Sequence, residues 1–448
     1  MSGPSLGLHL LKERRFLPLF VTQFLNAFND NLYKNAMVLF VVYQLLNDEH
    51  SETWFSALTT AIFILPFFTL SALSGQLADA NDKAKIIRIV KLCEIFIMML
   101  GAGGLALGLA GILTYSLAIP MMLLALFAMG VHSTFFGPIK YAVLPQHLRR
   151  DEVLAGTGLV EAGTYLAILG GTILAGVISY EASAVMVLVV AVVGYISGRQ
   201  VPPAPPEEAG HKIDWNVFRS SVTLVKATLH IPRLIMAIIA ISFFWTIGAV
   251  LFILFPPLVK NVLTSDKEVA SLFLAIFSIG VSIGSVVINR LLKGEVSAKY
   301  SAPSVIVMGV FVIAFHQVGQ GWERAPEGEL FEIWDFMYHA GTLPLLGCLL
   351  GIAIFGGMFV VPLYAFLTTT VKKSEAARTV AANNIVNAFA MVIGSLIATG
   401  LSLLGVQTVD QLILAAAMCL ISAWLGWKLH KVCDEGKVFD AKTLPDDV

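Results

Sequence analysis

Apolar residues follow one another in long, almost unbroken runs from one end of the chain to the other. A helix that crosses a bilayer needs about 20 such residues, and the short alternating segments of a membrane β-barrel are not the pattern seen. Because lipid offers the backbone no hydrogen-bond partner, each run is predicted to be a helix. Twelve spans are predicted, at 16–46, 53–79, 86–113, 117–141, 153–180, 182–199, 233–262, 268–292, 301–319, 337–367, 379–405 and 408–430.

Basic residues alternate between the segments that join these spans. Of the 29 Lys and Arg residues, 25 lie in the two tails and in every second loop, whereas only Lys260, Lys267 and Arg324 lie in the remaining loops. Cytoplasmic loops of membrane proteins carry such an excess of positive charge. The pattern therefore predicts that both termini and the long middle loop lie in the cytoplasm.

The chain is predicted to have two halves with six spans each. A stiff proline-rich stretch begins at Val201, and residues 212–230 place apolar and basic side chains at helical spacing, as in a helix that lies on a membrane surface. The expected organisation is a bundle at 1–200, a cytoplasmic linker with an interfacial helix at 201–232, a second bundle at 233–430 and a tail at 431–448. This all-α membrane layout resembles the major facilitator fold, which has twelve transmembrane helices in two six-helix bundles.

Composition excludes several classes of protein. Hydrophobic residues make up 57% of the 448 residues and charged residues 13%, against about 25% charged residues in soluble domains. A soluble enzyme and a disordered chain are therefore excluded, and a net charge of −1 leaves no basic field for nucleic acid. The four cysteines have no metal-ligand spacing, so neither a metal site nor a cofactor is predicted.

The first span carries an unusual set of polar side chains. An ionisable group in the hydrocarbon costs at least ~2.5–3.5 kcal/mol, so such a set needs a reason. At about 100° per residue, the polar side chains lie within an arc of about 80° on one face of the helix. Two of them, Asp30 and Lys34, are an acid and a base at i,i+4 spacing and can neutralise each other. It is either a structural seam or a binding site for a headgroup or cation, and six polar groups favour the site. The stripe is Gln23, Asn26, Asp30 and Lys34, flanked by Asn31 and Asn35.

Other spans add candidate site residues. Glu161 is taken as the only other acid deep in a span, and the corresponding span of the second half carries Asn384 and Asn387. Lys140 ends the fourth span, where it can pair with Glu161, bind a phosphate or extend to the membrane surface. His132 is interpreted as a packing residue rather than a proton relay, as is the histidine at position 316.

The loop after the second span reads Gly-Gln-Leu-Ala-Asp from position 75, followed by basic residues. We expect Gly75 to allow close helix approach and Asp79 to cap the next span or to hold Lys83 and Arg88 across the loop, as a latch on the cytoplasmic side. This segment resembles the signature of the major facilitator superfamily, although Ala80 replaces its usual arginine.

Four stretches resemble the bacterial lysophospholipid transporter family, and also the transporter half of transporter–acyltransferase fusions. They are 23–31, 137–141, 243–249 and 356–363. The resemblance implies transport of lysophospholipids, such as lysophosphatidylethanolamine, from the outer to the inner leaflet of the bacterial inner membrane for reacylation. It also implies membrane lipids and a cytoplasmic acyltransferase or acyl-ACP synthetase as partners, with Asp30 and Lys140 near the headgroup. Some members have an arginine where this chain has Phe252.

Two alternatives to this flippase remain open. One is a proton-coupled exporter of drugs or small amphiphilic solutes, in which Asp30 or Glu161 carries the proton. The other is a membrane scaffold for a cytoplasmic acyltransferase, which would use the 201–232 linker and the tail.

Overall fold

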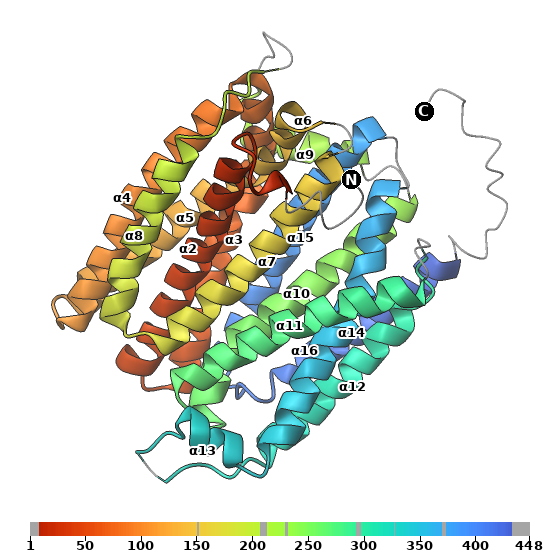
Figure 1. Ribbon diagram of the computed structural model, residues 1–448. Helices are drawn as coiled ribbons and strands as arrows, with labels where there is room; N and C mark the ends of the chain where they lie inside the picture. Colours follow the sequence, from red (N-terminus) through yellow and green to blue (C-terminus); the bar gives the residue numbers. More distant parts are fainter. Residues whose placement is uncertain are drawn as a thin grey trace. The chain divides into compact units, whose positions relative to one another are not determined.

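The computed structural model describes residues 9–149, 152–206, 213–228, 232–292, 297–326, 328–369 and 373–431, and these residues form a helical protein (Figure 1). Its long helices coincide with the predicted spans. They are α2 (Leu17–Phe40), α3 (Glu49–Ala80), α4 (Lys83–Leu109), α5 (Ile119–Ala142), α7 (Val153–Val177), α8 (Tyr180–Gly198), α10 (Pro232–Asn261), α11 (Lys267–Leu291), α12 (Ser301–Gln320), α14 (Thr342–Thr369), α15 (Lys373–Leu403) and α16 (Leu412–His430).

Within the described ranges, ten of these helices are long and apolar enough to cross a membrane. The other two are α2, which carries the polar stripe, and α7, of which Leu166–Val177 registers as a shorter apolar helix. The shorter elements are η1 (Val41–Leu45), η2 (Thr114–Ala118), α6 (Leu144–His147), α9 (Val217–Thr228) and α13 (Ile333–Tyr338). The prediction of an all-α membrane protein is confirmed.

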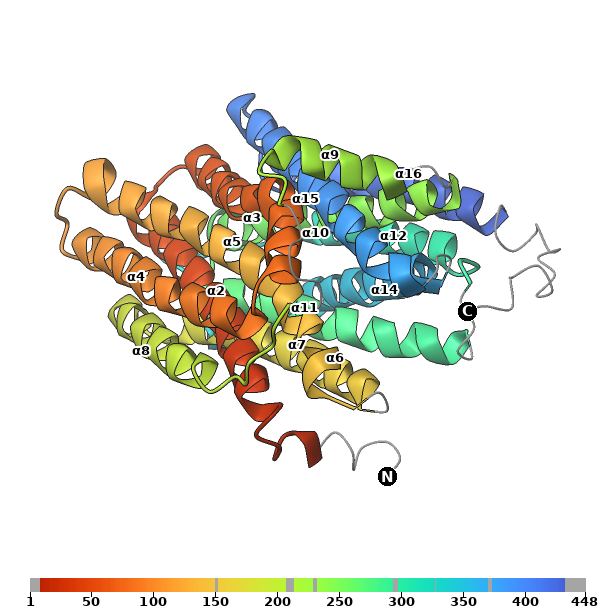
Figure 2. The same ribbon diagram turned by 90° about the horizontal axis from the view of Figure 1, so that it is seen from above.

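The helices divide into two compact units, Met1–Leu45 with Ile62–Ser221 and Leu46–Ala61 with Val222–Val448. In the first unit, α2 packs against α7 and α8, and α4 packs against α5 and α8. Figures 1 and 2 both show α4 and α8 side by side. The backbones of α2 and α7 touch at Gly171, where a Cβ atom would lie 2.4 Å from the carbonyl oxygen of Phe28.

The second unit is built on α10, α12 and α14, with α11, α15 and α16 packed around them. The first turns of α3 belong to this unit and bind it through Glu52, whose side chain is fully buried. Lys260 donates to Oε1 of Glu52 at 2.5 Å, and the Asn261 amide donates to its other oxygen. A buried carboxylate is stable only when it is paired in this way, so the start of α3 is tied to the end of α10.

Candidate functional site

The polar stripe of α2 is buried inside the first unit. Gln23, Asn26 and Asp30 are 1%, 5% and 6% exposed. Ser133 of α5 donates a short hydrogen bond to Oδ2 of Asp30, and the Asn26 amide donates to the same oxygen at 3.2 Å. The carboxylate is therefore held by neutral donors from its own helix and from α5.

Lys34 does not pair with Asp30. In the described part of the chain no ion pair within 4.0 Å joins them, and the Lys34 ammonium lies 5.6 Å from the ring centroid of Phe63. The two residues therefore form no direct ion pair, and Ser133 and Asn26 donate hydrogen bonds to the Asp30 carboxylate instead. Lys34 is only partly buried, and it keeps its charge in a cation–π contact.

The flanking amides of α2 have local roles. Asn31 donates to the carbonyl of Ala27 at 2.8 Å, and Asn35 donates to Thr172 Oγ1 of α7 at 3.1 Å. Asn35 is buried and Asn31 is partly exposed. Asn35 therefore links α2 to α7, whereas the side chain of Asn31 is partly accessible.

A second polar connection links α5, α7 and α2. Lys140 Nζ donates to Thr164 Oγ1 at 3.1 Å, and this hydroxyl lies 2.8 Å from Gln23 Oε1. Lys140 is partly exposed, so an ammonium group at the end of α5 reaches the polar stripe of α2. Glu161, predicted near Lys140, is on α7, but its side chain lies outside the described ones.

The asparagines of α15 belong to the second unit. Ser242 of α10 donates to Asn387 Oδ1 at 2.7 Å, and the Asn387 amide donates to Tyr364 Oη of α14 at 3.5 Å. Trp245 Nε1 donates to the same Tyr364 oxygen at 2.7 Å. Asn384 is exposed. The structure thus brings Asn387 into a polar cluster with groups from α10 and α14.

The loop between α3 and α4 differs in part from its prediction. A Cβ built at Gly75 would meet no described atom within 4 Å, so the described residues show no close helix approach at this glycine. The N-cap of α4 is Asp82, whose Oδ1 accepts from Ala84 N at 2.9 Å. The side chain of Asp79, the predicted cap, lies outside the described ones.

Lys83 and Arg88 contact the segment that follows α8, Lys83 through its backbone amide and Arg88 through its side chain. Lys83 N donates to the carbonyl of Ala204 at 2.9 Å, and Arg88 Nη2 donates to that of Val201 at 3.1 Å. Lys83 is 4% exposed. These contacts tie the start of α4 to the proline-rich stretch within the first unit.

A charged cluster in the first unit was not predicted. Lys91 and Glu94 of α4 are fully buried and form a short ion pair. His132 Nε2 of α5 lies 3.3 Å from Glu94 Oε2, and the Asn29 amide donates to Glu94 Oε1 at 2.9 Å. The prediction that Glu161 is the only other deep acid is therefore wrong. The i,i+3 spacing of Lys91 and Glu94 inside the predicted 86–113 span was the available signal.

Outside the spans, Arg15 joins the starts of α2 and α7. Its guanidinium binds both oxygens of Glu152 at 2.7 and 2.8 Å. These hydrogen bonds, together with one from the Arg149 backbone, hold the pKa of Glu152 down at about 2, and the Glu152 carboxylate raises the pKa of Arg15. The geometry is bidentate, which is the strongest form of such a pair.

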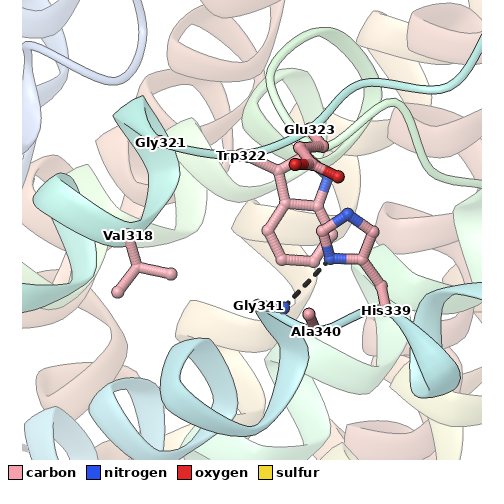
Figure 3. A pocket seen from close by; sticks show the side chains of 7 residues that line it. All are labelled: Val318, Gly321, Trp322, Glu323, His339, Ala340 and Gly341. Carbon is pink, nitrogen blue, oxygen red and sulfur yellow. Dashed lines mark hydrogen bonds between the residues drawn. The ribbon is translucent and has the colours of Figure 1, made fainter.

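A small pocket in the second unit is a weaker candidate. It measures about 250 Å³ and is lined by Val318, Gly321, Trp322, Glu323, His339, Ala340 and Gly341 (Figure 3). The rings of Trp322 and His339 stack with centroids 4.0 Å apart, and His339 Nδ1 accepts from Gly341 N at 3.1 Å. Both rings thus contribute to local packing, and the pocket is smaller than typical ligand sites.

Known proteins resemble the chain over most of its length. Residues 19–338 match the profile of the Major Facilitator Superfamily. The lysophospholipid transporter LplT of Escherichia coli (strain SE11) is 25% identical over 367 residues, covering 80% of this chain and 81% of that protein. LplT of Salmonella typhimurium (strain LT2) is 24% identical over 374 residues, covering 82% of each.

Solved structures have the same fold. A D-xylose–proton symporter superposes with a TM-score of 0.68 at 12% identity and covers 93% of this chain and 97% of its own. A bacterial homologue of the iron transporter ferroportin, in an inward-facing state, gives 0.65 at 16% identity, with 93% and 98% covered. At these identities the likeness concerns the fold alone.

Proposed function

Because the chain belongs to the Major Facilitator Superfamily, whose profile matches residues 19–338, we propose that it transports lysophospholipids across a bacterial inner membrane. The family makes the chain a multi-pass membrane transporter and not an enzyme, as the sequence predicts. The proposed substrate is a lysophospholipid such as lysophosphatidylethanolamine. The proposed direction is from the outer to the inner leaflet, by alternating access of the two bundles.

The proposal rests mainly on α2, which carries both a polar stripe and a row of aromatic side chains. One face holds the polar stripe around Asp30, and along the same helix Phe16, Phe20, Phe24 and Phe28 form a ladder with centroids 6.0–6.4 Å apart. A lysophospholipid joins a charged headgroup to one acyl chain, so it needs polar and apolar surfaces side by side. The relatives named lysophospholipid transporters support the same substrate class.

The partly exposed groups are proposed to receive the headgroup. Lys34 and Lys140 supply ammonium groups for the phosphate, and Asn31 supplies an amide. Asp30 is buried, and its carboxylate accepts the hydrogen bonds of Asn26 and Ser133 and so fixes their orientation. Asn384 and Asn387 of the second unit are further proposed substrate-binding residues. Gly75, Asp79, Lys83 and Arg88 are proposed to control the cytoplasmic side.

Delivery to the inner leaflet defines the proposed partner. A lysophospholipid that arrives there is the substrate for reacylation, so a cytoplasmic acyltransferase or acyl-ACP synthetase would consume it. Both chain termini are proposed to lie in the same compartment, in line with the distribution of basic residues.

Uptake of labelled lysophosphatidylethanolamine into proteoliposomes tests the function. Lys140→Ala should reduce uptake by about 10- to 100-fold, because a charge-assisted hydrogen bond contributes roughly 1.5–3 kcal/mol and each 1.4 kcal/mol is tenfold. Asp30→Asn should also reduce uptake. Lys226→Ala removes an exposed charge from α9 and should leave uptake unchanged.

Two outcomes would contradict the proposal. Wild-type protein that exports amphiphilic drugs against a proton gradient, with no lipid uptake, would identify the exporter instead. Wild-type protein that moves neither substrate, but binds an acyltransferase, would identify the scaffold.

A further inference from the structure

Four titratable side chains meet in the interior of the first unit. Lys91 and Glu94 are 0% exposed, His132 is 4% exposed and Asp30 is 6% exposed. Lys91 and Glu94 are ion-paired, and His132 Nε2 lies 3.3 Å from Glu94 Oε2. Ser133, the next residue after His132, donates to Asp30. Two neighbouring residues of α5, His132 and Ser133, thus contact Glu94 and Asp30 respectively.

The helices around the cluster add no further ionic contact. In the described ranges, no other charged side chain lies within 4.0 Å of these four groups. On α8, Gly194 makes room for Lys91, since a Cβ there would lie 3.0 Å from the ammonium nitrogen. On α3, Ser74 donates to the carbonyl of Thr134. Lys34, one turn beyond Asp30 on α2, is the nearest additional charge along that helix and lies over Phe63.

The charges of this cluster balance only when one proton is added. With Lys91 cationic, both carboxylates ionised and His132 neutral, the four groups sum to −1. An uncompensated buried charge is strongly unfavourable. Protonation of His132 gives two cations and two anions. His132 Nε2 faces Glu94 Oε2 at 3.3 Å, and the buried Nδ1 has no hydrogen-bond partner among the described residues, so the ring has a nitrogen available for a proton.

We propose that His132, which faces Glu94 and directly precedes the Ser133 donor to Asp30, is the binding site for one proton that is taken up together with the lipid. Lys34 can offset the charge of Asp30 while no substrate is bound. When Lys34 turns to the substrate phosphate, Asp30 loses that compensation, and a proton from the aqueous phase binds the imidazole in its place. This step rests on the proposed function, because it assigns the phosphate to Lys34.

Proton uptake on lipid binding tests the proposal. Purified protein in a weakly buffered detergent solution near pH 7.5 is titrated with lysophosphatidylethanolamine while a pH indicator and calorimetry record protons and lipid bound. Wild-type protein should take up as much as one proton per bound lipid, and His132→Gln should bind lipid with almost no uptake. His316→Gln is the matched control, since it removes a half-buried histidine of α12 that contacts Asp410 at 3.1 Å.

Transport provides a second measurement. If one proton is taken up with each lipid, wild-type lipid uptake should fall with rising pH by up to about tenfold per pH unit, which is the slope of a single proton. The slope should be flat in His132→Gln and unchanged in His316→Gln. Wild-type protein that binds lipid without taking up a proton overturns the proposal, and this measurement needs no variant to fold.

Failure of the proposed function can be distinguished from failure of the proposed proton site. If wild-type protein binds no lysophospholipid, the substrate is wrong, and the proton site is judged by histidine ring ¹⁵N signals of the empty protein between pH 5 and 8. The signal missing in His132→Gln, or in His132→Asn if that variant folds better, should titrate. A ring that stays neutral over this range overturns the proton site.

Discussion

Replacing Lys91 by methionine tests whether its ion pair with Glu94 stabilises the first unit. The change removes the ammonium but keeps most of the side-chain volume, so Glu94 stays buried at 0% exposure without its main counter-charge. Breaking a buried pair on one side costs about 3–5 kcal/mol. Asn29 at 2.9 Å and His132 at 3.3 Å still face the carboxylate, so we expect the lower end, ~3 kcal/mol.

The double variant Lys91→Met/Glu94→Leu separates charge from packing. It removes both buried charges, and such apolar replacements are often neutral or stabilising, so most of the stability should return. Asn29 keeps its second hydrogen bond, to the Val187 carbonyl at 3.2 Å. The double variant should nevertheless lose proton uptake, because the carboxylate facing His132 is gone.

The assay is equilibrium unfolding in detergent, followed by tryptophan fluorescence and by the fraction eluting as a monodisperse peak. A loss of ~3 kcal/mol is more than a hundredfold change in the unfolding equilibrium. If Lys91→Met unfolds within about 0.5 kcal/mol of the wild type, the range of ordinary surface changes, the buried ion pair is refuted. A double variant that is less stable than Lys91→Met would refute the charge argument.

Three other changes have defined outcomes. Glu152→Gln removes the partner of Arg15, and because the pKa of Glu152 is lowered from 4.5 to about 2, the stabilisation by this pair is complete above about pH 4.5 and fades toward pH 2. The difference in melting temperature between the variant and the wild type should therefore narrow as the pH falls, and a difference that does not change with pH would contradict this reasoning. Gly171→Ala places a Cβ against the backbone of α2 and should lower the free energy of unfolding by more than ~1 kcal/mol, whereas Gly347→Ala, which has open space around it, should not. Equal effects of the two variants would argue against the close approach of α2 and α7 at Gly171. Lys260→Met leaves a buried carboxylate at the start of α3 unpaired and should cost about 3 kcal/mol in unfolding measurements, and a neutral result would remove this tie.

Much of the fold could be predicted from hydrophobic runs. The spans predicted at 301–319 and 408–430 are α12 (Ser301–Gln320) and α16 (Leu412–His430). Such agreement follows from lipid itself, which forces continuous apolar helices. The start of α14 was placed at 337 instead of Thr342, because the short helix α13 continues the apolar pattern.

The partners of polar side chains could be predicted less well. Helical spacing correctly grouped Asn26 and Asp30 on one face of α2, since only local geometry is involved. The partner of Asp30 is Ser133, which is 103 residues away, and no local rule selects it. Lys91 lies near the start of the predicted span at 86–113, where a lysine can extend to the membrane surface, so its position alone does not reveal its burial beside Glu94.

The polarity of α2 has a consequence for how the protein is made. This helix is not among the ten described helices apolar enough to cross a membrane by themselves, yet it precedes them in the chain. Two hydrogen-bond acceptors of Asn29 lie 65 and 158 residues downstream, at Glu94 and Val187. We therefore expect α2 to become stably inserted only after α4 and α8 have followed it, so that this half assembles cooperatively rather than helix by helix.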